Sequence, residues 1–76
     1  MKAILEFNLP EDKSDFNLAV KGSDWWHVCW KMDQLLRGQL KYNDDISEDT
    51  RKAYEDIRGE LRQFMFDSNV SFDDVE

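Results

Sequence analysis

The sequence contains one cysteine, Cys29, and one histidine, His27. A lone cysteine excludes an internal disulfide, and a structural metal site needs about four ligands where these two residues supply two. On a helix, side chains two residues apart point about 200° from one another, so His27 and Cys29 cannot meet at one atom. We therefore expect Cys29 to be a small apolar core residue, His27 to be solvated, and no metal to be bound.

Long apolar runs are also missing, since none approaches the roughly 20 residues of a membrane span. Near the N-terminus, Glu6 interrupts what would be the apolar part of a signal peptide. The single thiol is typical of a reducing compartment. We expect a soluble, cytoplasmic protein.

No motif for catalysis is present either. Asp and Glu number seventeen, but none stands in a recognisable acid–base pattern. The acidic segment 44–48 lacks the alternating oxygen ligands and central glycine of a calcium-binding loop. We expect a protein that is not an enzyme, has no catalytic residues and uses no cofactor.

Negative charge is abundant and unevenly placed. The net charge is −7; residues 1–42 carry six acids and six bases, whereas residues 43–76 carry eleven acids and four bases. This excess opposes direct contact with nucleic-acid phosphates or anionic lipid. The expected partner is a protein with a basic surface.

The apolar pattern predicts one domain, residues 1–76, of the α+β class and mostly helical. Residues 3–9 alternate as a half-buried strand that ends at Pro10. Helices are expected at about 10–21, 24–42 and 48–66, the last capped by Ser47. An acidic tail, 67–76, follows, and Val70 to Phe72 is a candidate short strand beside residues 3–8.

The expected core is formed by apolar stripes of an antiparallel pair made by the second and third helices. Its predicted members are Trp25, Cys29, Met32, Leu36, Tyr54, Ile57, Leu61 and Phe64. A chain this short buries only about 60 to 65% of the surface that its unfolded form exposes. We therefore expect a homodimer, with residues 3–8 pairing either with their copy in a second subunit or with the Val70 segment.

Three tryptophans lie within six residues, which is more aromatic surface than one small helix can hide. Trp26 and Trp30 share a flank with Asp33 and Arg37, which are spaced for an ion pair. Tryptophan and arginine are frequent binding hot spots, so these four residues are candidate partner-binding residues. The alternatives are that the flank is covered inside the monomer or by a second copy.

A second candidate surface is an acidic stripe along the third helix. Its members fall within about 40° of one another around the helix, and the stripe is about 27 Å long. They are Asp49, Asp56, Glu60 and Asp67. The stripe is either a solvated helix face or an imitation of a row of phosphates, as in a DNA mimic.

Several motifs resemble a group of small, acidic early proteins of tailed phages: the run Glu6-Phe7-Asn8-Leu9-Pro10-Glu11-Asp12, the pairs Leu36-Arg37 and Lys41-Tyr42, and a final Phe72-Asp73. The resemblance covers most of the chain. It implies a phage protein that binds and inhibits a host or anti-phage defence protein in the host cytoplasm. Two other functions remain open: an accessory or adaptor subunit of a phage replication or recombination complex, and an oligomeric sponge that holds a small nucleotide signal through tryptophan stacking and Arg37.

Overall fold

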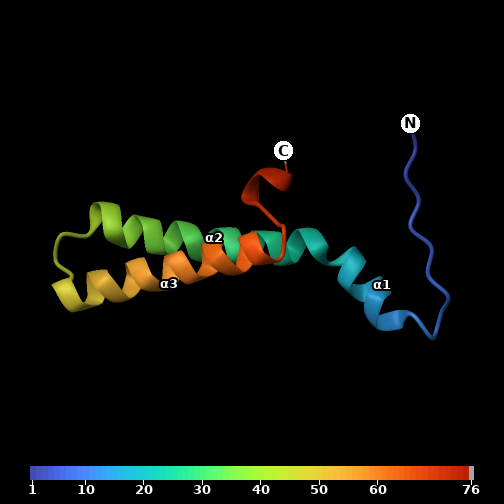
Figure 1. Ribbon diagram of the computed structural model, residues 1–76, viewed down its shortest axis with the longest axis horizontal. Coiled ribbons are helices and arrows are strands. Elements are labelled where there is room, and N and C mark those ends of the chain that lie inside the picture. Colours follow the sequence, from blue (N-terminus) through green and yellow to red (C-terminus); the bar gives the residue numbers. More distant parts are fainter. Residues whose placement is uncertain (76) are drawn as a thin grey trace.

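The structure, a computed structural model, describes residues 1–75 and contains three α-helices and one short 3₁₀ turn in that range (Figure 1). Helix α1 spans Lys13–Val20, α2 spans Gly22–Tyr42, α3 spans Glu48–Asp67, and the turn η1 spans Phe72–Asp74. The helices α2 and α3 lie side by side and antiparallel, as predicted. Helix α1 projects beyond the N-terminal end of α2, and the N-terminal segment turns at the start of α1 (Figure 1). Phe7 of this segment meets Phe16 of α1 edge-on, with ring centroids 5.7 Å apart.

The prediction of an α+β fold is wrong, because residues 1–75 contain no strand and the described chain is all-α. Residues 3–8 have no regular secondary structure, and Ile4 and Leu5 are exposed. The sequence alternates there as a strand would. A strand, however, needs a neighbouring backbone for its N–H and C=O groups, and this segment has none beside it.

The second predicted strand, Val70 to Phe72, is not formed, because Ser71 caps the turn η1 and Phe72 begins it. The Ser71 hydroxyl accepts a hydrogen bond from the Asp73 N–H at 3.1 Å, and the Asp74 carboxylate accepts one from the Ser71 N–H at 2.8 Å. This reciprocal cap occupies the Ser71 N–H and directs the following residues into a turn. The local capping hydrogen bonds therefore favour a turn here, although the brief apolar alternation predicted a strand.

The loop end of the α2–α3 hairpin is fixed by a helix cap and by a hydrogen bond between the two helices. Ser47 caps α3 as predicted, its hydroxyl accepting a hydrogen bond from the Thr50 N–H at 3.1 Å. From α3, the Arg51 guanidinium donates to the Leu40 carbonyl at 2.7 Å, near the C-terminal end of α2. The connection between the helices is thus held by groups that would otherwise lack partners.

The seam between α2 and α3 buries little apolar surface. Leu36, 6% exposed, is the one apolar side chain classed as buried in residues 1–75, and Asp33 beside it has no exposed surface. Of the predicted core, Cys29, Tyr54 and Leu61 are half-buried. The other four predicted core residues are exposed, which corrects the prediction: Trp25, Met32, Ile57 and Phe64.

The molecule is elongated, measuring 52 × 28 × 19 Å with a radius of gyration of 17.0 Å. A compact domain of this length has a radius of gyration of about 11 Å. None of the helices in residues 1–75 combines the length and the apolar character needed to cross a membrane.

Candidate functional site

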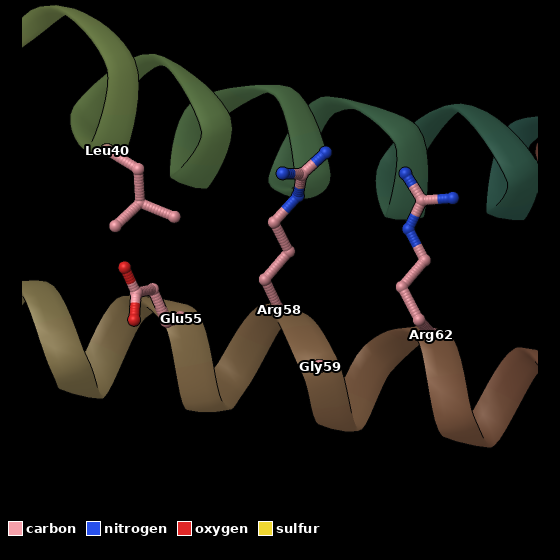
Figure 2. Close-up of a pocket in the computed structure, with 5 residues that line it drawn as sticks. All are labelled: Leu40, Glu55, Arg58, Gly59 and Arg62. Carbon is pink, nitrogen blue, oxygen red and sulfur yellow. The ribbon is translucent and has the colours of Figure 1, made fainter.

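A buried carboxylate joins the two long helices. Asp33 on α2 accepts hydrogen bonds from Arg58 Nε at 3.0 Å and Arg58 Nη2 at 3.4 Å, and from Arg62 Nη2 at 3.0 Å. Figure 2 shows Arg58 and Arg62 extending from α3 toward α2. The predicted pairing of Asp33 with Arg37 is therefore not formed, because the carboxylate is directed into the seam and Arg37 is exposed.

The electrostatics of Asp33 follow from this geometry. Burial raises the pKa of Asp33, but hydrogen bonds from Arg58 and Arg62, together with their positive charges, outweigh burial and hold the pKa below its ordinary value of 3.8. Asp33 is ionised at neutral pH, and its negative charge is paired with Arg58 and Arg62 inside the hairpin. Its role is structural, and it offers no surface to a partner.

An aromatic cluster is formed by Trp26, Trp30 and Phe72. The rings of Trp26 and Trp30 stack with centroids 6.1 Å apart, and Phe72 meets Trp26 edge-on at 6.0 Å. The Arg62 guanidinium lies 5.0 Å from the centre of the Phe72 ring. The turn η1 thus partly covers Trp26, whereas Trp30 remains exposed.

This arrangement reverses the expected roles of the first two tryptophans. Trp25, predicted as core, is 58% exposed, and Trp26, predicted on the flank, is half-buried. The seam on α2 is turned toward Asp33 and Trp26 because the arginines of α3 bind Asp33. In the sequence, the signal for this orientation is the spacing of Arg58 and Arg62, which lie about one turn apart on α3. Their partner, Asp33, lies 25 and 29 residues earlier in the chain.

A mostly apolar pocket of about 390 Å³ lies beside the aromatic cluster, between α2 and the C-terminal residues. Trp25, Trp26, Cys29 and Met65 contribute to its wall, together with Phe72, and no basic side chain lines it. The Trp26 Nε1–H is buried without a hydrogen-bond partner in the described part of the chain. A pocket of this composition does not suit an anionic nucleotide, and Arg37 is not among its lining residues.

The predicted acidic stripe forms an acidic edge on α3, made of Asp49, Asp56, Glu60 and Asp67. All four side chains are exposed. Lys52 Nζ lies 3.1 Å from the Asp56 carboxylate, and both residues are on the surface. Because α3 is helical from residue 48 to residue 67, the edge is continuous over its predicted length of about 27 Å.

The acidic edge and the aromatic cluster are separate surfaces. Arg62, which covers Phe72, lies about 120° around α3 from Asp56 and about 160° from Glu60. The structure therefore brings Trp26 and Trp30 together and keeps the four carboxylates aligned, but it does not join the two sets into one site.

An apolar face, which the sequence analysis assigned to the core, lies next to the acidic edge. It is formed by Met32, Leu36, Ile57, Leu61 and Phe64, which line a groove of about 430 Å³. Met32 and Ile57 are 51% and 53% exposed, and Phe64 is 63% exposed. The acidic edge borders this groove through two carboxylates, Asp56 and Glu60.

Comparisons with known proteins gave no relative: no family model matches the chain, and no curated protein or solved structure matches it. Within residues 1–75, no group of three or more His, Cys, Asp or Glu side chains is placed to hold a metal ion. The candidate surfaces are therefore interpreted from their own geometry and charge.

Proposed function

We propose that the protein is a non-catalytic binding protein that inhibits a host or anti-phage defence protein by covering a basic surface on it. The observation that carries this proposal is the acidic edge. Four exposed carboxylates lie along one helix in a chain of net charge −7. The resemblance to small phage proteins supports an inhibitor acting in the host cytoplasm.

A continuous acidic edge suits a basic groove that normally follows a nucleic-acid backbone. Aligned negative charges steer a basic partner during association and favour one orientation in the complex. The helix fixes the backbone positions from which the carboxylates project, so little backbone entropy is lost when the partner arrives. This is the physical content of DNA mimicry.

The test compares a variant of the edge with a matched control of equal charge. The edge variant carries Asp49→Asn, Asp56→Asn and Glu60→Gln; the control carries Asp15→Asn, Asp24→Asn and Asp44→Asn, all exposed residues outside the edge. Proteins captured from host lysate by each tagged chain are quantified over a salt series, with double-stranded DNA as competitor. We expect salt and DNA to release the partner from the wild type and the control, and the edge variant to capture at least tenfold less. Equal capture by edge variant and control would contradict the proposal.

The aromatic cluster and Arg37 are tested separately as anchors. Trp30 and Arg37 are exposed on α2, and Trp26 supports the Trp30 ring. If they contact the partner, Trp30→Ala with Arg37→Ala weakens capture without changing its dependence on salt. Unchanged capture would restrict the binding surface to the acidic edge.

An adaptor subunit of a phage replication or recombination complex is the second candidate, and the presence of two separate exposed surfaces favours it. Expression in uninfected host cells distinguishes the two functions. Growth arrest by the wild type and not by the edge variant supports inhibition. Normal growth, together with co-purification with phage proteins during infection, supports the adaptor.

A further inference from the structure

We propose that the apolar face binds a second copy of this chain, so that two α2–α3 hairpins pack into a four-helix bundle. The inference does not require the proposed function to hold, although the acidic edge and the apolar face share a border at Asp56 and Glu60. It concerns the groove formed by Met32, Leu36, Ile57, Leu61 and Phe64.

A single hairpin lacks the burial that its helices need. Helices of 21 and 20 residues gain most of their stability from packing of an apolar side, yet Leu36 is the one apolar side chain classed as buried in residues 1–75. On the apolar face, side chains from both helices stand open on the same side of the seam. A second apolar layer placed on this face completes a core of ordinary thickness.

The chain exposes more surface than a compact monomer of its mass, and the excess is large enough to supply the interface of a stable dimer. The surface measures 6780 Å², whereas a compact monomer of 9.1 kDa exposes about 4,900 Å², an excess of about 1,900 Å². The N-terminal segment and α1 account for part of this excess. Even half of it, taken from each of two copies, gives an interface of about 1,900 Å², the size of a specific protein–protein contact.

The charges around the apolar face favour a second copy over a foreign helix. Asp56 and Glu60 border the face on α3. The exposed Lys31 lies about 100° around α2 from Met32, on the side away from Leu36, and so stands beyond the opposite border. A two-fold axis along the hairpin sets α2 of one copy over α3 of the other. Each acidic border then faces the basic border of the other copy.

The heights of these charges along the hairpin also agree. Contacts of Asp33 with Arg58 and Arg62 place residue 33 level with about residue 60. Lys31 is therefore within about 3 Å of the height of Glu60, and the two-fold axis preserves this height in the other copy. The face is therefore self-complementary in charge.

The first test measures the mass of the full chain by sedimentation equilibrium from micromolar to millimolar concentration. We expect twice the chain mass of 9.1 kDa, and a thermal unfolding midpoint that rises with protomer concentration. A folded chain that stays at 9.1 kDa over the whole range would overturn the proposal.

The second test locates the interface with two phenylalanines of α3. Phe64 lies on the apolar face, whereas Phe66, 80% exposed, lies about 160° away around the helix. We expect Phe64→Glu to weaken the dimer at least 100-fold and Phe66→Glu to leave it unchanged. A dimer that survives Phe64→Glu, or that is lost on deletion of residues 1–9 alone, would place the contact elsewhere and overturn the proposal.

A third test uses exposed residues, whose substitution leaves the hairpin folded even if Phe64→Glu does not. Lys31→Glu is expected to weaken the dimer several-fold, and Lys31→Glu combined with Glu60→Lys to restore it. Equal dimer affinity in the wild type, the single variant and the double variant would reject the arrangement with α2 over α3.

Discussion

Asp33 is a fully buried acid with two arginine partners, and both partners reach solvent. The side chains of Arg58 and Arg62 are 30% and 52% exposed. Removal of the buried charge therefore leaves cations that water can still hydrate. The energetic loss is the loss of charge-assisted hydrogen bonds, together with incomplete pairing of the group that replaces the carboxylate.

We expect Asp33→Asn to lower the free energy of unfolding by about 1–3 kcal/mol, measured by urea denaturation. Asp56→Asn is the matched control, because Asp56 is an exposed acid whose partner Lys52 is also exposed; its effect should stay within about 0.5 kcal/mol. Equal effects of the two substitutions would show that the buried pair contributes nothing specific.

The pH dependence of stability follows from the same residue. The folded-state pKa of Asp33 is below 3.8, its ordinary value, so the stabilisation is complete well above pH 3.8 and is lost as pH falls toward the folded-state pKa. Unfolding measured between pH 5 and pH 2 should become easier toward acid in the wild type. The slope should be smaller in Asp33→Asn, and an identical slope in both proteins would contradict the assigned ionisation.

At the scale of elements, the turn η1 acts as a cover for Trp26. Phe72 meets Trp26 edge-on, and the Arg62 guanidinium lies over the Phe72 ring. We expect Phe72→Ala to expose Trp26, shifting tryptophan emission to longer wavelength and increasing quenching by acrylamide. The experiment is performed with Trp25→Phe and Trp30→Phe so that one indole reports. Quenching unchanged by Phe72→Ala would show that η1 does not cover this ring in solution.

The elements differ in how far they follow from sequence. The three helices were predictable because their periodicity and the Ser47 cap are local signals. The strand at residues 3–9 was mispredicted because alternation describes a strand only when another backbone is beside it. The choice between Trp25 and Trp26 depended on Asp33 and its two arginines, a contact between distant residues that periodicity cannot reveal.

The candidate surfaces also differ in how far the sequence predicts them. Alignment of Asp49, Asp56, Glu60 and Asp67 follows from helical geometry alone, so sequence was sufficient to place the acidic edge. The apolar face was missed because Met32, Ile57 and Phe64 have the spacing of core residues. Whether such residues face a core depends on how many elements are available to cover them, and α1 projects away from the hairpin (Figure 1).

At the scale of the whole molecule, the hairpin and the N-terminal segment should differ in amide protection. Within the described chain, residues 1–7 take part in no backbone hydrogen bond, whereas α2 and α3 are continuous helices. We expect hydrogen–deuterium exchange at residues 2–7 to proceed at the rate of an unfolded peptide, and exchange in the hairpin to be much slower. Protection of residues 2–7 that grows with protein concentration would instead indicate strand pairing between subunits.

The ion-paired Asp33 has a consequence for the alignment of the two long helices. If α3 slid by one helical turn, about 5.4 Å, the carboxylate would separate from at least one guanidinium while remaining out of water. Apolar contacts along the same seam are few and would tolerate such a slip. The sliding register of the hairpin is therefore specified by polar contacts, the Asp33 ion pairs together with the hydrogen bond from Arg51 to the Leu40 carbonyl, which leaves the surrounding hydrophobic positions free to vary without misaligning the helices.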